Sequence, residues 1–598
     1  MKLPILNEIP SMTDMIDVFK GYNHNLRIGD GEFFDMQNLS SSKYPVISPR
    51  GQRGLYVEGE NTFPVNPQGL IAKDALCYVD GADFVVNGYH VDMELSTEPE
   101  DCPKQLISMG AYVIIMPDKK WVNTSDLAKF GKIEASVTTA STVNFEMCRV
   151  DGSAYEGAWV SPEAPEEPKN MALWIDTSST PHTLKQWAET SAMWVSIATT
   201  YVKISVEGDN KIFEPFEVND GIKISGIKDK RLSDLNSTMI IWDKGDDYIV
   251  VTGIIDEVIQ QEEPITIERQ MPNMDFIIES ENRLWGCRYG VAKNGEVVNE
   301  IYASKLGDFK NWNCFMGIST DSYAATVGTD GQFTGAIAHL GYPIFFKENC
   351  MHKVYGNYPA NYQINTTTCR GVQKGSHKSL AIVNEVLYYK SRNAICAYDG
   401  SLPQEISYAL GQVPYSSAVA CSHGNKYYIS MHDDTLNKDD LSDITQWHLF
   451  VYDASTGLWH KEDHTRVVDF CSCRDELYFI NHSDHQIKTM FGSGIKDTAK
   501  IRWMAETGLI GTDSPTKKYI SKLNIRMSLE LNTHVFFYIQ YDSNEAWEFL
   551  FRMEGKTLRS FNVPIRPRRC DHLRLRIEGF GEAKIFSIAK TIEQGSDV

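Results

Sequence analysis

The sequence lacks long apolar runs and an excess of basic charge, and each absence excludes a class of protein. No apolar run approaches the about 20 residues of a membrane-spanning helix, so we expect no membrane-spanning segment. The N-terminus has no continuous apolar core and no small-residue cleavage site, which predicts a protein made and kept, or assembled, in a cytoplasm. With 58 Lys and Arg against 79 Asp and Glu, the net charge is −21, so sequence-specific binding to nucleic acid is not expected.

Helical periodicity is also scarce. The two best helical candidates are short, residues 11–22 and 183–194. Almost everywhere else the chain alternates short apolar segments with Gly-, Pro-, Asn- and Asp-bearing turns, and aromatic residues make up 11% of it. This pattern is typical of an all-β protein.

The motifs of common catalytic and metal sites are missing as well. The sequence has no G-x-S-x-G, no H-E-x-x-H and no phosphate-binding loop, so no nucleophile or nucleotide site is indicated. Cys471 and Cys473 are the one close pair among 12 cysteines, and no second pair completes a tetrahedral metal set. We therefore expect buried reduced thiols, no catalytic residue, no metal and no cofactor.

Two Asp-bearing segments superficially resemble functional sites. In Y-D-A-S-T-G-L-W (452–459) the order of Asp453 and Ser455 is wrong for an Asp-box turn, which favours a hairpin with Trp459 packed between sheets. The segment 432–443 lacks the order of an EF-hand loop and is better explained as a solvated loop than as a calcium site. Its acidic residues are Asp433, Asp434, Asp439, Asp440 and Asp443.

One sequence pattern recurs along the chain: a strand, a turn with Gly, Asn or Asp, and a second strand rich in Tyr, Phe, Ile and Val. It occurs at residues 74–94, 104–124, 274–290, 335–356, 378–400, 416–434 and 466–490. From residue 335 the spacing is about 40–50 residues, the period of a four-stranded β-propeller blade, and we predict about seven blades. The paired aromatic strands would be the inner strands, with the D-G (399–400) and S-T-G (455–457) corners as the hairpins between them.

This strand–turn–strand pattern is interrupted in two regions, which predicts further domains. Residues 131–270 contain a Pro- and Glu-rich linker (159–171) that leads into differently spaced strands, as expected for a β-rich domain inserted through one blade edge. Beyond residue 500 the strands are longer and alternate cleanly, as in a β-sandwich or jelly roll. The predicted domains are therefore an N-terminal segment with the first blades (1–130), the inserted domain (131–270), the remaining blades (271–499) and a C-terminal sandwich (500–598).

A cluster of arginines stands out within the acidic chain. Its members are Arg566, Arg568, Arg569, Arg574 and Arg576. The cluster could form a subunit interface with an acidic neighbour, or its members could pair across strands within the C-terminal domain. Arg574 and Arg576 alternate with Leu573 and Leu575, so one face of a strand could carry both arginines while the other is buried.

Several sequence segments resemble structural proteins of tailed bacteriophages. They include G-D-G-E-F-F-D-M-Q-N-L (29–39), N-R-L-W-G-C-R-Y-G (282–290), P-I-F-F-K-E-N-C (343–350) and the segment 374–407, and the likeness covers about residues 25–125 and 270–495. More narrowly, they resemble the tail-nozzle and packaged-DNA-stabilisation group with a β-propeller. The resemblance implies a ring of usually six copies in the virion tail, attached to the connector and to other tail proteins. Such a ring retains packaged DNA, lets duplex DNA pass at ejection and has no enzymatic activity.

Two other classes of function remain open. The alternative is a tail adhesin that binds host-surface glycan, with Trp121, Trp312, Trp459 and Trp547 able to stack on sugars if they are exposed. An extracellular glycosidase is disfavoured because no acid pair is evident in the sequence.

The D-G turn gives a direct test of the predicted strands. Gly400 should need a positive φ, so Gly400→Val is expected to cost about 1–3 kcal/mol of folding stability and to impair assembly rather than any activity. Thermal melting of the purified variant measures this. Melting like that of the parent protein would contradict the turn.

Overall fold

The computed structural model is built almost entirely of β-strands. It describes residues 11–58, 62–99, 103–155, 157–179, 182–197, 200–208, 211–291, 295–437, 440–496, 500–512, 516–544, 546–555 and 557–594. Within these ranges the helices are five short 3-10 turns, and none is long and apolar enough to cross a membrane. The turns are η1 (Lys230–Leu235), η2 (Pro359–Asn361), η3 (His377–Ser379), η4 (Tyr408–Leu410) and η5 (Ile444–Gln446).

The all-β prediction is confirmed, but both helical candidates are wrong. Residues 11–22 form β1 (Ser11–Ile16) and β2 (Gly21–Tyr22), and residues 183–194 lie in β19 (Thr183–Ala188) and β20 (Met193–Ser196). β1 pairs along its whole length with β54, at the other end of the chain. Long-range pairing therefore overrides a weak local helical pattern.

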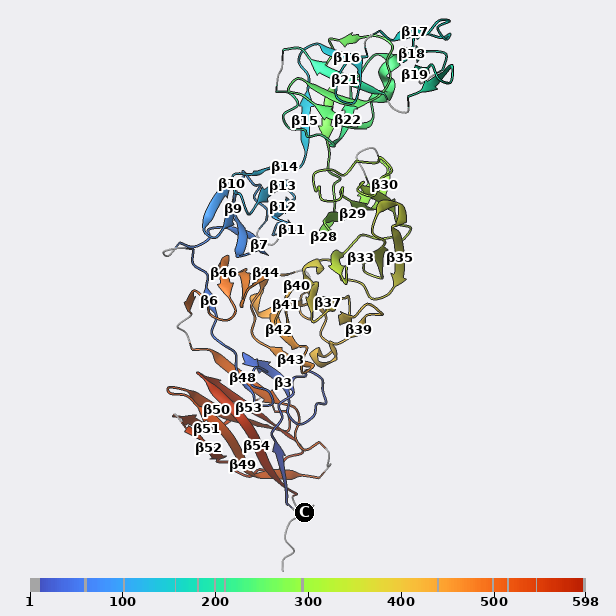
Figure 1. The fold of residues 1–598 in the computed structure, drawn as a ribbon. Coiled ribbons are helices and arrows are strands. Elements are labelled where there is room, and N and C mark those ends of the chain that lie inside the picture. The colour runs from blue at the N-terminus through green and yellow to red at the C-terminus, as the bar shows by residue number, and fades with distance from the viewer. Residues whose placement is uncertain are drawn as a thin grey trace, which may run out of the picture.

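Seven sheets occupy the middle of the molecule, and we call them the ring sheets (Figure 1). The first sheet has the strands β7 (Pro67–Ala72), β8 (Leu76–Asp80), β9 (Asp83–Val86) and β10 (Tyr89–Asp92). The second has β11 (Gln105–Met109), β12 (Tyr112–Met116), β13 (Lys120–Asn123) and β14 (Phe130–Lys132). The third has β28 (Phe276–Ser280), β29 (Arg283–Val291), β30 (Val297–Ala303) and β31 (Tyr323–Thr326). The fourth has β32 (Gly335–His339), β33 (Tyr342–Lys347), β34 (Cys350–Tyr355) and β35 (Gln363–Thr368). The fifth has β36 (Ala381–Val383), β37 (Val386–Lys390), β38 (Ile395–Tyr398) and β39 (Gln404–Glu405). The sixth has β40 (Tyr415–His423), β41 (Lys426–Asp433), β42 (Trp447–Asp453) and β43 (Leu458–Lys461). The seventh contains β44 (Val467–Cys473), β45 (Glu476–Asn481), β46 (Gln486–Thr489), β6 (Gly54–Leu55) and β47 (Ile495–Lys496).

The first strands of the ring sheets lie side by side in a closed circuit. β7 lies beside β11, β11 beside β28 and β28 beside β32, η3 bridges to the fifth sheet, and β36, β40 and β44 lead back to β7. Strand β6, from the start of the chain, pairs with β46 and completes the last sheet. This β-propeller arrangement agrees with the coarse fold that the sequence predicts.

In six of the seven predicted segments the paired strands are the first and second strands of their sheets, whereas residues 74–94 supply the second and third, β8 and β9. Their aromatic residues are largely buried. Tyr389 in β37 and Tyr427 in β41 are fully inaccessible to solvent. The predicted hairpins between them are wrong, because the D-G and S-T-G corners join third to fourth strands. The inner hairpin of the fifth sheet instead turns at Asn384 and Glu385, both with positive φ. Gly400 itself has the expected positive φ, +109°.

Residues 135–269 form a separate β module, the inserted module, at one end of the molecule (Figure 1). Its strands are β15 (Ala135–Thr138), β16 (Val143–Cys148), β17 (Trp159–Ser161), β18 (Leu173–Asp176), β19, β20, β21 (Tyr201–Val206), β22 (Gly221–Ser225), β23 (Thr238–Ile240), β24 (Asp243–Lys244), β25 (Tyr248–Thr252), β26 (Ile259–Gln261) and β27 (Thr266–Arg269). β15 and β27 pair antiparallel, so the chain enters and leaves the module side by side. The predicted exit through one blade edge is wrong, because this stem links the second ring sheet to the third.

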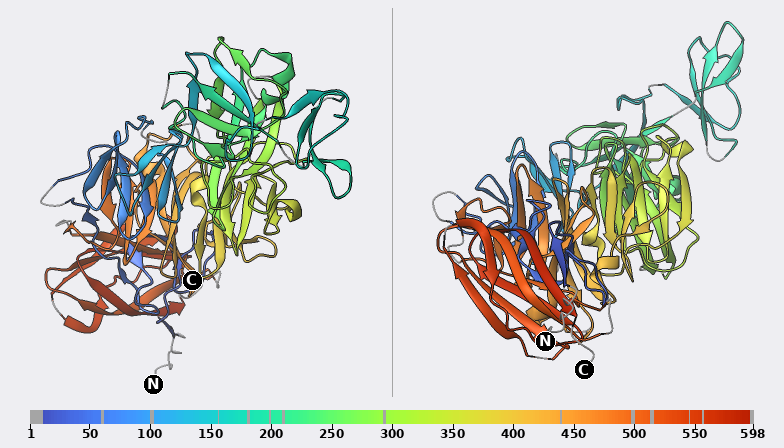
Figure 2. Two further views of the ribbon diagram at one scale, coloured as in Figure 1. Left: turned by 45° about the horizontal axis from the view of Figure 1, so that its top comes forward. Right: turned by 90° about the horizontal axis from the view of Figure 1, so that it is seen from below.

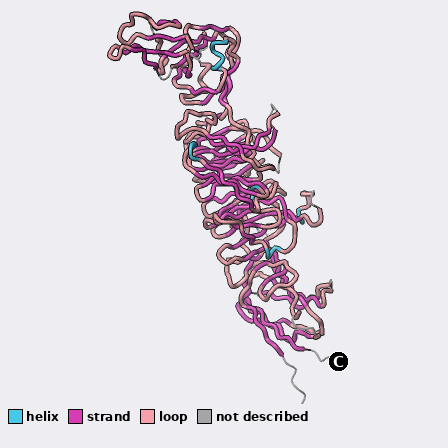
Figure 3. Tube along the Cα trace, turned by 90° about the vertical axis from the view of Figure 1, so that its right-hand side faces the viewer, coloured by secondary structure: helices cyan, strands magenta, loops and turns pink. Residues whose placement is uncertain are grey.

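Two larger sheets form the end of the molecule opposite the inserted module (Figure 3), and both ends of the chain contribute strands to them (Figure 1). One sheet has the order β1-β54-β49-β52 and the other β2-β3-β48-β53-β50-β51. Their strands are β3 (Glu32–Gln37), β48 (Arg502–Thr507), β49 (Lys518–Leu529), β50 (His534–Tyr541), β51 (Glu548–Glu554), β52 (Thr557–Val563), β53 (Leu573–Phe580) and β54 (Ala583–Gln594), and the short pair β4 (Leu39–Ser40) and β5 (Ser48–Pro49) lies beside them. Apolar side chains of the two sheets, such as Met527 and Phe537, belong to one buried core.

Four charged side chains fasten the N-terminal segment to the ring just before β6. Arg53 contacts Glu462 at 2.8 Å and Asp463 at 2.9 Å, and Arg50 contacts Asp463 at 3.3 Å. Burial acts to raise the pKa of Asp463, but the two guanidinium groups outweigh it and lower that pKa to about 2. The cluster is neutral overall and mostly buried, so each charge depends on its partners.

The cluster predicts a large cost for removing one cation. Arg53→Met leaves Glu462 and Asp463 short of a partner, and we expect a loss of about 3–5 kcal/mol in the free energy of unfolding. Urea denaturation measures this loss. The double variant Arg53→Met/Glu462→Gln should recover part of it, and a single variant as stable as the parent would contradict the coupling.

Buried histidines predict loss of stability in mild acid. Burial is the main cause that lowers the pKa of His352 to about 4, of His448 to about 2 and of His460 to about 3. Below about pH 6.5 the unfolded chain takes up protons at these sites and the folded chain does not, so stability falls as the pH falls. Each histidine should contribute a slope of about 1.4 kcal/mol per pH unit, down to its own folded pKa.

Urea denaturation between about pH 7 and about pH 5 measures this slope, above the range where most carboxylates titrate. His352→Gln should reduce the slope by about a quarter, because desolvation also lowers the pKa of His377 to about 4 and this histidine contributes in the same way. Equal stability at both ends of this range would contradict the assignment.

Candidate functional site

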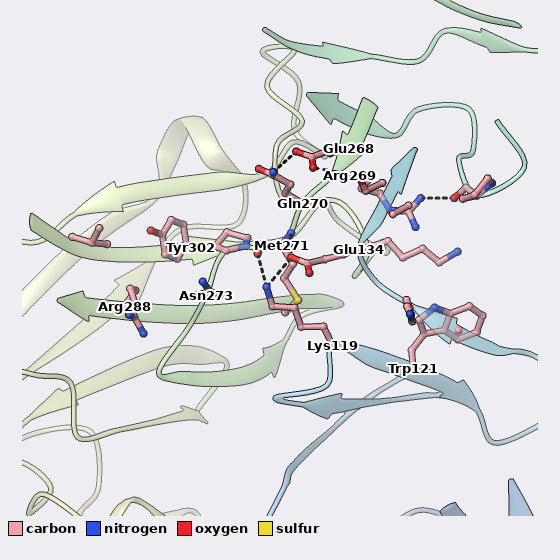
Figure 4. A pocket seen from close by; sticks show the side chains of 18 of the residues that line it. Lys119, Trp121, Glu134, Glu268, Arg269, Gln270, Met271, Asn273, Arg288 and Tyr302 are labelled. Atoms are coloured by element: carbon pink, nitrogen blue, oxygen red, sulfur yellow. Dashed lines mark hydrogen bonds and ion pairs between the residues drawn. The ribbon is translucent and has the colours of Figure 1, made fainter. Parts of the chain in front are cut away.

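A cavity of about 1290 Å³ opens where the inserted module meets the ring. We call it the stem cleft, because the β15–β27 pair passes through its lining. The second ring sheet, the stem and the third ring sheet each contribute side chains to it (Figure 4). Clefts at such junctions are common ligand sites, since walls from separate units can converge there.

The second ring sheet contributes an indole with space beside it. Trp121 in β13 is half-buried and packs edge-on against Tyr112 and Phe309, with ring centroids 5.6 and 5.8 Å away. Directly across the strand pair stands Gly131, where a Cβ would lie 3.5 Å from the indole nitrogen. Among the described residues this nitrogen has no hydrogen-bond partner. The absent side chain at Gly131 therefore leaves room beside the indole.

The stem carries four polar side chains on one face. Ser136 pairs with Glu268 across the ribbon, and Glu134 and Gln270 lie two residues further along the two strands. Glu268 accepts hydrogen bonds from Ser136 Oγ at 3.2 Å and from Gln270 Nε2 at 2.6 Å. Glu134 contacts Lys119 Nζ at 2.7 Å and accepts from the backbone N–H of Met271 at 3.2 Å. Figure 4 shows these two carboxylates on the same side of the stem.

The third ring sheet and the loop after it supply cationic and phenolic groups. Arg288 in β29 pairs with Asp275 at 2.9 Å, and Tyr302 in β30 donates to Glu300. Lys310 contacts Glu217 of the inserted module at 3.0 Å and lies 5.0 Å from the centre of the Trp121 ring. The hydrogen bond from Lys310 is the main cause that lowers the pKa of Glu217. Of these three pairs, Lys310–Glu217 joins the module to the ring, and the other two lie within the ring sheet.

The cleft has a different balance of charge from the rest of the chain. Its lining contains two carboxylates, Glu134 and Glu268, in a protein of net charge −21. The lining cations are Lys119, Lys132, Arg269, Arg288 and Lys310. Carboxylates outside the lining form ion pairs with three of these five cations: Asp220 with Arg269, Asp275 with Arg288 and Glu217 with Lys310. The arrangement presents a fixed mixture of donors and acceptors rather than one strong charge.

The predicted arginine cluster lies far along the chain, in and before β53, and not in the cleft lining. Arg566, Arg568 and Arg569 are exposed before β53, and Arg568 pairs with Glu548 at 2.9 Å. Arg574 pairs with Glu506 at 2.9 Å and Arg576 with Glu578 at 2.7 Å, while Leu573 and Leu575 are buried. The predicted alternation is confirmed. Cross-strand pairing accounts for Arg574, and a subunit interface stays a prediction.

The other sequence candidates serve local structure. Asp453 accepts from the N–H of Ser455 at 3.0 Å, and Trp459 is buried with its indole donating to Ile406 O, as predicted for a hairpin. Asp440 and Asp443 accept from backbone N–H groups two residues ahead, and Asp439 lies outside the described residues. Cys471 and Cys473 are buried free thiols. Of the four candidate tryptophans, Trp312 and Trp459 are buried, Trp547 is half-buried beneath Arg576, and Trp121 lines the cleft.

Comparison with known proteins gives structural likeness only. No family model and no curated protein matches the chain. Among solved structures, an exo-β-1,3-galactanase from Phanerochaete chrysosporium matches with 9% identity, 52% of this chain, 94% of its own and a TM-score of 0.20. A family 43 arabinoxylan arabinofuranohydrolase from Bacillus subtilis matches with 7% identity, 53% and 94% coverage and a TM-score of 0.19. The tricorn protease matches with 10% identity, 84% and 53% coverage and a TM-score of 0.12.

These matches correct two expectations from the sequence. A tail-nozzle subunit, with a tail adhesin as the alternative, and the absence of enzymatic activity are both contradicted, because the galactanase and the arabinofuranohydrolase are glycoside hydrolases and none of the three matches points to a bacteriophage tail. The resemblance to tail proteins, the ring of copies and the place in a virion stay predictions. With TM-scores near 0.2, the function of this chain has to be argued from the cleft itself.

Proposed function

We propose that the stem cleft binds an oligosaccharide. The observation that carries the proposal is the indole of Trp121, with an open space over Gly131, in a cleft of about 1290 Å³ lined by fixed donors and acceptors. That volume exceeds the about 300–1,000 Å³ typical of small-molecule sites, which favours an extended ligand of several units.

The side chains of the cleft suit the two kinds of surface that a sugar presents. Sugar rings have apolar C–H faces, which pack against aromatic rings, and hydroxyl groups that both donate and accept hydrogen bonds. Trp121 and Tyr302 offer aromatic surface, and Glu268, Gln270 and Arg288 offer acceptors and donors around it. Hydrogen bonds already fix Glu268 and Gln270, and an ion pair fixes Arg288, so little ordering is needed on binding.

A second candidate function is hydrolysis of a glycosidic bond in the same cleft, and the pair Glu134 and Glu268 favours it. The strand register makes them diagonal neighbours, which are about 7–8 Å apart in an antiparallel ribbon, with their Cβ atoms somewhat closer. Inverting glycosidases place their two carboxyl groups about 6.5–9.5 Å apart, with room for the attacking water. In that reaction one carboxylic acid protonates the leaving oxygen while the other carboxylate accepts a proton from water.

The scaffold around the cleft is part of the proposal. We propose that the ring sheets are the blades of a seven-bladed propeller and that the two terminal sheets form a β-sandwich. The closed circuit of first strands supports the first statement, and the shared core of the two sheets supports the second. The exposed arginines Arg566 and Arg569 remain candidates for a subunit interface.

Two substitutions on facing strands test the binding proposal. Trp121→Ala removes the aromatic surface, and Gly131→Leu fills the space beside it with little strain, because its Cβ would make only ordinary contacts. Each should weaken binding to a panel of soluble polysaccharides by about tenfold or more, measured by affinity electrophoresis. Trp547→Ala, which removes a half-buried indole far from the cleft, should bind like the parent.

The carboxylates separate binding from hydrolysis. Glu134→Gln and Glu268→Gln should keep polysaccharide binding and, if the chain is a hydrolase, each should lower the release of reducing ends by a factor of about 100 or more. Binding by the parent with no release of reducing ends would reject hydrolysis alone. Absence of binding to every polysaccharide would reject the proposed function.

A further inference from the structure

Four tryptophans occupy one face of a small sheet at the tip of the inserted module. The sheet has the order β17-β18-β19-β20. Trp159 pairs with Trp174, Trp174 with Lys185, and Trp187 with Trp194, and residues paired in this way point to the same face. This surface, the tryptophan face, therefore carries a third of the 12 tryptophans of the chain.

Contacts with neighbouring groups fix most of the side chains of the tryptophan face. Trp174 is buried, and its indole donates to the carbonyl oxygen of Ser161 at 2.9 Å. Trp194 packs edge-on against Trp174 and Trp187, with centroids 5.3 and 5.5 Å away. Lys185 contacts Asp176 at 2.7 Å and lies 4.8 Å from the centre of the Trp174 ring. Trp159 at the edge strand remains 62% exposed.

This sheet projects from the body of the molecule. In the right-hand view of Figure 2 it is the teal sheet at the upper right, well separated from the ring. Its buried apolar residues, such as Ile175 and Leu184, belong to none of the large hydrophobic cores. Its other face also shows apolar side chains, with Met193 55% and Val195 48% exposed. So much exposed apolar surface on a projecting sheet is typical of a docking site.

The charge around the sheet indicates what docks there. Residues 157–197 contain five acidic side chains and two lysines. Three of the acids, Glu163, Glu166 and Glu167, lie on the linker between β17 and β18, are exposed, and form no ion pair with any described residue. Exposed indole and unpaired carboxylates together complement a side chain that is both cationic and planar, which is the guanidinium group of arginine.

We propose that the tryptophan face docks an arginine-bearing segment of a partner protein. A guanidinium group can stack on the exposed ring of Trp159 while it pairs with the linker glutamates. Anionic lipid and nucleic acid would both meet repulsion at the same linker. The site is separate from the stem cleft and does not depend on the proposed function.

Two labelled synthetic peptides of about 15 residues test the proposal against the full-length protein. They share leucine positions, and one carries arginine where the other carries glutamate. Fluorescence anisotropy should detect binding of the arginine peptide and none of the glutamate peptide. Trp159→Ala should weaken the arginine peptide by about tenfold, the loss typical of a stacked anchor residue. Glu166→Gln/Glu167→Gln should weaken it severalfold and reduce its salt dependence.

Matched controls separate this site from general attraction to an acidic protein. Leu531→Ala removes an exposed apolar side chain in the C-terminal sheets, and Asp246→Asn/Asp247→Asn removes two adjacent exposed carboxylates elsewhere in the inserted module. Both controls should bind the arginine peptide like the parent. The proposal is overturned if the parent does not bind that peptide, if both peptides bind equally, or if the control and test variants lose the same affinity.

Discussion

The closure of the ring by β6 is the constraint on which the rest of the structure depends. This strand of two residues precedes the first ring sheet in sequence, yet it completes the last one between β46 and β47. Without it the seventh sheet would lose a strand and expose an edge at the seam. The buried charges of Arg50, Arg53, Glu462 and Asp463 hold the segment that leads into β6. A local strand pair and a local charge cluster thus join residues about 400 positions apart.

This closure also determines where the other parts of the chain can lie. Strand β3 precedes β6 and β48 follows β47, so the two ends of the chain emerge together and pair in the same sheet. The inserted module leaves from a different part of the ring, between the second and third sheets, through a stem of two paired strands. An insertion with adjacent entry and exit leaves the circuit of inner strands intact. Recognition surfaces can then be added without disturbing the scaffold.

The sequence predicts what depends on local periodicity and misses what depends on distant pairing. Alternating apolar residues in β53 reveal a strand, and the spacing of the aromatic pairs indicates a propeller. The pairing of β1 with β54 leaves no signal in either segment, so residues 11–16 could be taken for a helix. The cleft is a similar case. Its stem residues Glu134 and Glu268 flank the predicted boundaries at 131 and 270, but only the folded stem brings them to one face.

The two recognition surfaces of the inserted module differ in what they can bind, because their charges are arranged differently. In the stem cleft, cations such as Lys119, Arg269 and Lys310 are each matched by a carboxylate, so the wall is polar but close to neutral. At the tip, the linker glutamates have no such partner within the described residues, and they lie between β17 and β18, the strands that carry Trp159 and Trp174. Matched charges suit an uncharged ligand rich in hydroxyl groups, whereas unmatched carboxylates require a cation from outside. We therefore propose that the base of the module holds a glycan and its tip a basic protein segment, without competition between them.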